Sequence, residues 1–199
     1  MVDKSPRRHP RMHCDFAFWV GGTAENIGDL PELERLPGAA GIKVFIGSST
    51  GNLLVEDDET LGRILKVIRR RSAYHCEDEP RLRERMGLRV PGDPSSHPVW
   101  RDATAALMAT QRLVTLARKY NAPVHVLHVS TADEIEYLKD HKDIASVEVT
   151  PHHLTLVAPD CYQTLGTYAQ MNPPVRDEHH RAGIWQGVTQ GVADILGSD

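Results

Sequence analysis

The 199-residue sequence has no long hydrophobic run. No segment approaches the roughly 18–20 continuous apolar residues that a membrane-spanning helix needs. The first residues, Met1–His13, carry four basic side chains, and no apolar stretch follows them. This is not the pattern of a secretory signal. We therefore expect no membrane partner and no export signal in this stretch.

Cysteine is scarce, and an excess of basic charge is absent. The three cysteines, Cys14, Cys76 and Cys161, are far apart and form no CxxC motif. An odd, widely spaced set fits a reducing cytoplasm better than a disulfide framework. The net charge of −4 provides no basic field that would attract nucleic acid. We expect a cytoplasmic protein that binds a small-molecule substrate and no nucleic acid.

Six short apolar runs alternate with segments of helical character. The runs are Cys14–Gly21, Gly41–Gly47, Ser72–Glu77, Val124–Val129, Ser146–Thr150 and Val192–Asp199. The expected helices are Thr23–Leu33, Asp57–Arg71, Pro80–Leu88, His97–Asn121, Thr131–His141 and Glu178–Gln190. Short apolar strands that alternate with helices are typical of parallel sheets covered on their faces. The fold class is therefore predicted to be α/β.

Within that class the sequence favours a barrel over an open sheet. It has no GxGxxG or Walker A motif, which disfavours a nucleotide-binding open sheet. Polar residues stand near the C-terminal ends of the runs, where a (β/α)8 barrel builds its active site. Six runs are two short of the eight strands of a closed barrel. We predict an incomplete barrel over residues 11–199, preceded by an unmatched tail, residues 1–10.

Lys43 stands inside an apolar run, and three metal-capable residues stand near the ends of other runs. Burial disfavours the charged form of a lysine and so favours its neutral, nucleophilic amine. Lys43 is thus either an edge residue that reaches solvent or a chemical group. His75, His128 and Asp199 carry the ligand types that zinc-like ions use. A two-metal hydrolytic site also needs a bridging anion, which a lysine supplies once its amine captures carbon dioxide as a carbamate.

Six strings of the sequence resemble the amidohydrolase superfamily, and within it the long, bacterial type of dihydroorotase. They are IKVFIGSSTG, AYHCEDE, VLHVSTADEI, EVTPHHL, MNPPVR and ILGSD. They occur in the order of that family, and the resemblance as a whole covers nearly the entire chain, from about Arg11 to Asp199. Hydantoinases and dihydropyrimidinases share the metal residues but match TPHH and NPPVR less well, so a hydantoinase-type amidohydrolase is an alternative.

The resemblance implies a function and a role for each candidate residue. Lys43 would be the carbamylated bridge between two Zn²⁺ ions, and His75 and His128 would hold the second metal. Asp199 would bind the first metal and act as general base and acid, and Asn172 would contact the pyrimidine ring. The implied reaction is the interconversion of N-carbamoyl-L-aspartate and dihydroorotate in de novo pyrimidine biosynthesis. A homodimer, or an assembly with aspartate transcarbamoylase, is a possible partner arrangement.

The sequence also departs from that family. It contains no His-x-His-x-Arg motif for the first metal and the substrate carboxylate, no Asn-Thr of the second strand, and no His-Ala-Pro-His stretch. The six runs therefore correspond to strands 3–8 of a metal-dependent hydrolase barrel. We expect an internal piece of a dihydroorotase that is weakly active or inactive. A catalytically dead, dihydroorotase-like structural partner, or a gene fragment, is the alternative.

Other polar residues near the runs are predicted to be structural. We expect Glu77 and Asp78 to be solvated, and His125 to point away from the site. His152 and His153 are expected to serve packing or to support the ligands.

Overall fold

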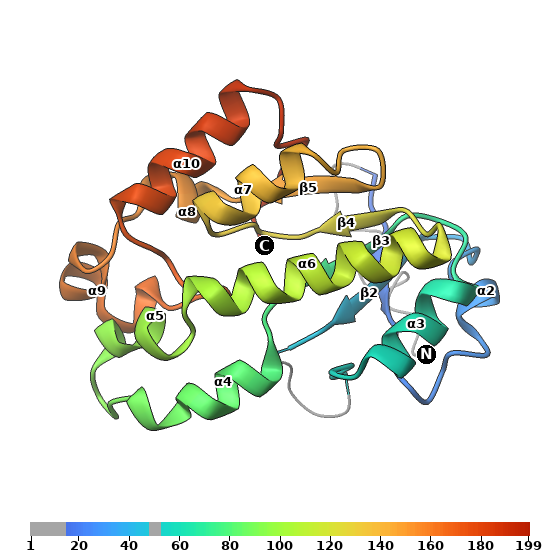
Figure 1. Ribbon diagram of the computed structural model, residues 1–199, viewed down its shortest axis with the longest axis horizontal. Coiled ribbons are helices and arrows are strands. Elements are labelled where there is room, and N and C mark those ends of the chain that lie inside the picture. The colour runs from blue at the N-terminus through green and yellow to red at the C-terminus, as the bar shows by residue number, and fades with distance from the viewer. Residues whose placement is uncertain (1–14, 48–52) are drawn as a thin grey trace.

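The computed structural model describes residues 15–47 and 53–199 (Figure 1). The predicted tail, residues 1–10, lies outside the described residues. The division of the chain into this tail and a barrel domain therefore stays a prediction.

The described residues contain one parallel sheet whose strands follow the order of the chain, β1 to β6. The strands are β1 (Phe18–Gly21), β2 (Ala39–Phe45), β3 (Ser72–His75), β4 (Val124–Val126), β5 (Ala145–Val149) and β6 (Ile195–Leu196). Each of the six predicted runs overlaps one of them, and β2 and β5 begin slightly before their runs, at Ala39 and Ala145. In the described part of the chain no pairing joins β6 to β1, so the sheet is an open section of a barrel. The predicted incomplete (β/α)8 architecture is confirmed.

Helices follow the strands along the chain. They are α2 (Leu30–Leu33), α3 (Asp58–Val67), α4 (Glu79–Arg85), α5 (His97–Trp100), α6 (Ala103–Tyr120), α7 (Ala132–Lys139), α8 (Pro151–Thr155), α9 (Asp160–Leu165) and α10 (Glu178–Thr189). Short 3-10 turns are η2 (Met86–Leu88), η3 (Pro94–Ser96) and η4 (Gly166–Ala169). Along the outside, α3 packs on α6, α6 on α7, and α7 on α10 (Figure 1). None of the helices in the described ranges is long and apolar enough to cross a membrane.

Two helix predictions were wrong because local side-chain hydrogen bonds interrupt the expected helices. The expected helix His97–Asn121 is two helices, because Asp102 has an extended backbone and its carboxylate accepts from the Ala105 N–H at 3.0 Å. A capping aspartate starts a new helix and ends the preceding one. The segment from Thr23 is helical only from Leu30, and before that Asn26 bonds locally, accepting from the Thr23 N–H and donating to the Gly21 carbonyl, each at 2.9 Å.

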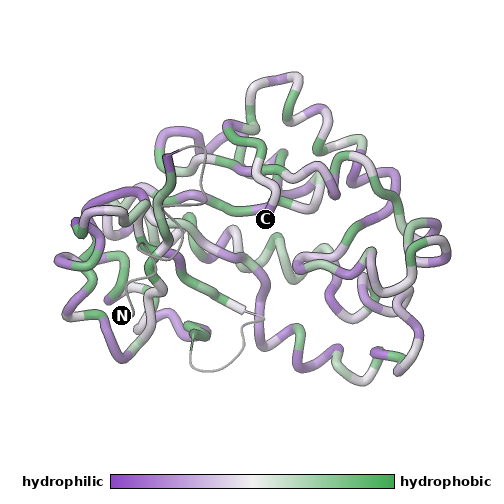
Figure 2. Tube along the Cα trace, turned by 180° about the vertical axis from the view of Figure 1, so that it is seen from behind, coloured by the Kyte–Doolittle hydropathy of each residue, from purple (hydrophilic) through white to green (hydrophobic). Residues whose placement is uncertain are grey.

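The two faces of the sheet differ in character. Residues such as Val44, Tyr74 and Val126 are fully buried in one cluster with the outer helices. Figure 2 shows hydrophobic segments along the strands and hydrophilic segments at the outer loops and helix ends. Strand residues alternate between the two faces, so the neighbours of these apolar residues, among them Lys43, His75 and His125, lie on the opposite face. The chemistry is therefore confined to the inner face of the curled sheet.

We predict that Gly183→Ala destabilises the fold by about 1–3 kcal/mol, the usual cost of overpacking. A Cβ at Gly183 would lie 2.3 Å from Ala132 Cβ and 2.8 Å from its Cα, so α10 would have to move away from α7. Urea unfolding followed by circular dichroism measures the change. Gly87→Ala is the control, because a Cβ there meets no atom within 4 Å. Equal midpoints for the two variants would contradict the packing argument.

Candidate metal and catalytic site

Three of the predicted residues come together at the carboxyl ends of adjacent strands. Lys43 is in register with Ala73, and Phe45 with His75. Register partners in a parallel sheet point to the same face, so Lys43 and His75 share the inner face. His128 follows β4 by two residues, beside the end of β3. The neighbouring strands β2, β3 and β4 thus converge on one point.

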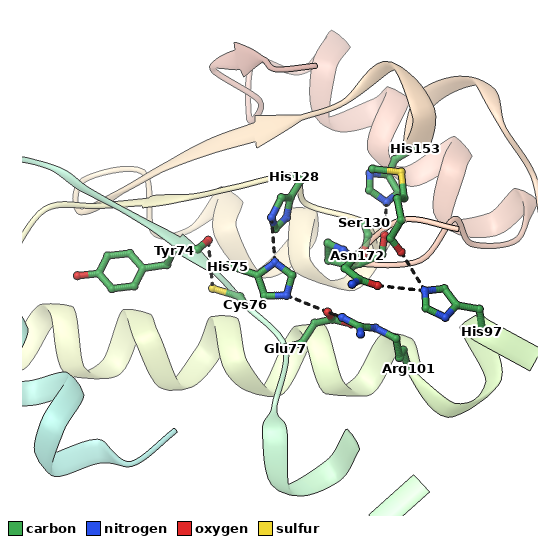
Figure 3. Close-up of polar contacts among 12 residues, drawn as sticks. Tyr74, His75, Cys76, Glu77, His97, Arg101, His128, Ser130, His153 and Asn172 are labelled. Carbon is green, nitrogen blue, oxygen red and sulfur yellow. Dashed lines mark hydrogen bonds and ion pairs between the residues drawn. The ribbon is translucent and has the colours of Figure 1, made fainter. Parts of the chain in front are cut away.

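The rings of His75 and His128 face each other in the interior. His75 Nδ1 and His128 Nε2 are 3.1 Å apart, and the ring centroids are 4.8 Å apart in an edge-to-face arrangement (Figure 3). Their exposed fractions are 3% and 1%. Two nitrogens on one tetrahedral zinc ion, each at about 2.0–2.1 Å from it, would be roughly 3.3 Å apart. The donor type and the separation therefore fit two ligands of one metal ion.

His128 is held neutral in an unusual backbone conformation. Its φ is +37°, which lies in the left-handed region that non-glycine residues rarely adopt. Burial drives the pKa of His128 well below its ordinary value of 6.5, and the nearby charges of His75, His153 and Lys43 lower the pKa further. Its Nδ1 is buried and has no hydrogen-bond partner. A neutral imidazole is the form that binds metal.

Lys43 approaches this pair without bonding to it. Its side chain is partly buried, and Nζ lies 4.9 Å from the centroid of the Phe45 ring. The Phe45 ring in turn lies 5.7 Å from the His75 ring. The lysine is therefore close enough for its charge to act on His128, and its amine stacks on an aromatic face rather than on a carboxylate.

Glu77 is central to the site, and the prediction that Glu77 and Asp78 are solvated was wrong. The exposed fraction of Glu77 is 0%. Its Oε2 lies 2.9 Å from His75 Nε2, and its Oε1 accepts from Arg101 Nε at 3.2 Å. Burial alone would raise the pKa of Glu77, but the hydrogen bond from His75 and the charge of Arg101 outweigh it and lower the pKa to about 2. Asp78 is also buried and caps α4 through the Arg81 N–H.

Asn172 lines a cleft. The cleft has a volume of about 510 Å³ and lies between the 89–97 segment and η4. Asn172 itself is exposed, and its Oδ1 is 3.1 Å from His97 Nε2 (Figure 3). Burial lowers the pKa of His97, and the charge of Arg101 lowers it further. His97 was not predicted as a site residue, because its sequence context of Ser and Pro indicates only a helix start.

Arg176 was also missed, although it ends the MNPPVR string. Its exposed fraction is 5%, its Nη1 donates to the Arg101 carbonyl, and its Nη2 lies 3.5 Å from Ser130 Oγ. Its Nε is buried without a hydrogen-bond partner. Burial lowers the pKa of Arg176, whereas the charges of Glu77 and Glu134 oppose that shift. The position of Arg176 in a motif was the one signal that could have identified it.

Asp199 is not brought to the histidines. It is exposed, three residues after β6, and its φ of +56° is left-handed. Among the described residues no hydrogen bond or ion pair joins it to His75 or His128. No group of three or more His, Cys, Asp or Glu side chains in the same ranges is arranged to hold a metal ion. The structure thus brings together two imidazoles beside a lysine, and leaves the predicted aspartate outside.

His125 and His153 have structural contacts. His125 is in register with Ala73, so its side chain leaves the strand on the inner face. Its ring nevertheless bonds to Ser146 Oγ at 2.8 Å, not to the other histidines. His153 bonds to Thr150 Oγ1 and to the Pro173 carbonyl, at 2.9 and 3.0 Å.

Curated proteins similar to this chain carry three related names, dihydroorotase, allantoinase and L-hydantoinase. A dihydroorotase of Methanosarcina acetivorans is 32% identical over 90% of the chain, and the match covers 41% of that protein. An allantoinase of Streptomyces avermitilis is 31% identical over 95% of the chain and is covered over 43% of its length. The chain therefore spans less than half the length of these relatives. The resemblance to dihydroorotases is confirmed, and the names together point to a cyclic amidohydrolase.

Solved structures show the same fold. The L-hydantoinase (dihydropyrimidinase) from Arthrobacter aurescens has a TM-score of 0.90 at 24% identity, over 100% of this chain and 46% of that chain. The dihydropyrimidinase from Brevibacillus agri has a TM-score of 0.78 at 25% identity, over 92% and 42%. No family model matches the sequence.

We predict that the buried His153 makes folding stability fall as the pH drops. Its pKa is lowered from 6.5 to about 4, chiefly by burial. The unfolded chain therefore binds the proton first, and stability is lost between about pH 6.5 and pH 4, by about 3 kcal/mol at 1.36 kcal/mol per pKa unit. Urea unfolding at several pH values should give a flatter profile in this range for His153→Gln.

The control is His179→Gln, which changes an exposed histidine on α10. This variant should keep the profile of the unchanged chain. Identical profiles for His153→Gln and the unchanged chain would contradict the assignment.

Proposed function

We propose that this chain carries the second-metal half of a cyclic-amidohydrolase site of dihydroorotase type. The observation that carries the proposal is the pair of buried, facing nitrogens His75 Nδ1 and His128 Nε2, 3.1 Å apart at the ends of β3 and β4. The pair lies in a chain that is similar to dihydroorotases over 90% of its length.

The residues fit a zinc ion at this point. Zinc prefers imidazole nitrogens as ligands, and both histidines offer a nitrogen in a water-poor interior. Lys43 on β2 would add a carbamate oxygen after its amine captured carbon dioxide. The carbamate is negatively charged, so the positive charge of Lys43 would no longer act on His128. When bound, the metal would polarise the ring carbonyl of the substrate and lower the pKa of a bound water.

The remaining predicted roles are proposals of the same kind. Asp199 would serve as ligand, general base and acid, which requires it to turn inward from its exposed position. Asn172, at the cleft edge, would contact the substrate ring through its amide. The proposed reaction is the interconversion of N-carbamoyl-L-aspartate and dihydroorotate in de novo pyrimidine biosynthesis, in the cytoplasm. A homodimer or an assembly with aspartate transcarbamoylase belongs to the same proposal.

A hydantoinase-type activity is the second candidate. An L-hydantoinase of Paenarthrobacter aurescens is 25% identical over 100% of this chain and 45% of that protein, and a hydantoinase structure matches the fold with a TM-score of 0.90. The two candidates use the same metal pair and differ in the ring that the cleft accepts. A third reading is a catalytically inactive structural partner, motivated by the absence of His-x-His from the sequence.

We predict that His75→Ala/His128→Ala weakens zinc binding by at least about tenfold. Each replacement removes one of the two facing donors. Loss of a residue that only supports a ligand lowers metal affinity roughly 10–100-fold, and loss of a ligand itself should lower the affinity at least as much. Competition with a chromophoric chelator measures the affinity.

The matched control replaces two exposed histidines, His152→Ala/His179→Ala, and should leave zinc affinity unchanged. If the two double variants bind zinc equally, the ion is held elsewhere and the proposal fails.

We predict negligible dihydroorotate hydrolysis by the zinc-loaded chain, at least about a thousandfold below ordinary turnover of about 1–10³ s⁻¹. The reason is that two imidazole donors and one substrate-orienting arginine are missing from the sequence. Absorbance of dihydroorotate, with hydantoin and allantoin assayed in parallel, checks this. Turnover at an ordinary rate would overturn the prediction, and the ring that reacts would choose between the two candidates.

A further inference from the structure

Both ring nitrogens of His75 have a partner. On one side Nδ1 faces His128 Nε2, and on the other side Nε2 lies 2.9 Å from Glu77 Oε2 (Figure 3). His75 is the last residue of β3, and Glu77 follows it in the segment that leads into α4. The ring is thus held between a second imidazole and a carboxylate.

Glu77 is itself fixed by a guanidinium fork. Arg101 approaches both oxygens of the carboxylate, with Nε donating to Oε1 at 3.2 Å and Nη2 donating to Oε2. The side chains of Glu77 and Arg101 are 0% and 5% exposed. Two parallel hydrogen bonds of this kind fix the orientation of the carboxylate and also compensate its charge. The carboxylate cannot rotate away from His75 without leaving a buried arginine unpaired.

The backbone that carries Arg101 is also fixed. Arg101 ends α5 where the chain breaks before α6, and its N–H bonds to the His97 carbonyl at 3.1 Å. Its own carbonyl accepts from Arg176 Nη1. The helix break that the Asp102 cap creates is therefore what aims the guanidinium at Glu77.

This arrangement sets the tautomer of a neutral His75 ring. A carboxylate only accepts hydrogen bonds, so the proton of the neutral ring belongs on Nε2. The lone pair is then on Nδ1, directed at His128. A carboxylate behind a metal-binding histidine fixes its tautomer and raises its basicity.

We propose that Glu77, held by Arg101, is the positioning residue that fixes the ring and tautomer of His75 for metal binding. This inference deepens the proposed function and rests on it for the metal. The orientation of the ring does not depend on a metal and is measured separately.

The experiment uses the full chain and the variant Glu77→Leu/Arg101→Met, which removes both charges together. In the metal-free protein, the hydrogen-bonded Nε2 proton of His75 should give a downfield proton signal coupled to ¹⁵N. We expect that signal to be lost in the variant, and its zinc affinity to fall about 10–100-fold. If the double variant does not fold, Glu77→Gln, which keeps the shape of the side chain, is measured instead, with a smaller loss of the same sign.

The control is Glu134→Gln, another buried carboxylate, which bonds to Thr110 and Thr131 and not to His75. It should keep both the proton signal and the zinc affinity. A folded Glu77 variant with unchanged zinc affinity would overturn the positioning role, whether or not the signal moved. If the unchanged chain binds no zinc, the proposed metal site fails, and the proton signal alone decides whether Glu77 orients the ring.

Discussion

The buried ion pair between Glu77 and Arg101 is the interaction on which the rest of the site depends. It joins the end of β3 to the break between α5 and α6, two segments that the chain separates by more than twenty residues. A buried carboxylate is tolerated only when it is paired and hydrogen-bonded. Here His75 and Arg101 provide both, and the same contacts that neutralise the charge also aim the imidazole. The contacts that allow Glu77 to be buried as a carboxylate are therefore the same contacts that fix the geometry of the site.

A second buried carboxylate and a second buried arginine continue this polar interior. Glu134 bonds to Thr110 Oγ1 and Thr131 Oγ1, each at 2.8 Å, and burial raises its pKa. Arg176 lies between the charges of Glu77 and Glu134 and donates to the Arg101 carbonyl. Two acids and two arginines therefore balance in charge within the interior. Removing one member leaves its partner desolvated, so single charge deletions should cost more than paired ones.

The sequence was sufficient for the strands and for the metal-capable residues that follow them, because both have local signals. Apolar runs bounded by turns marked all six strands, and His75 and His128 stood out as polar residues at run ends. The break before α6 was missed because the apolar spacing continues through it, and only the cap of Asp102 interrupts the helix. Glu77 was misjudged because nothing local shows that Arg101, on another segment, will cover it. Charge burial is a tertiary property, so a residue in an acidic string looks solvated until its partner is known.

The difference between His128 and Asp199 follows from where their strands lie in the sheet. His75 and His128 are on strands that pair directly, so the local register of β3 and β4 is enough to bring their nitrogens within 3.1 Å. Asp199 follows β6, which is two strands from β4 and has no further strand on its other side among the described residues. In a barrel, residues on distant strands meet across the interior only when the sheet curls to closure. Pairing between neighbours thus sets the second-metal pair, while the position of Asp199 depends on closure of the whole barrel.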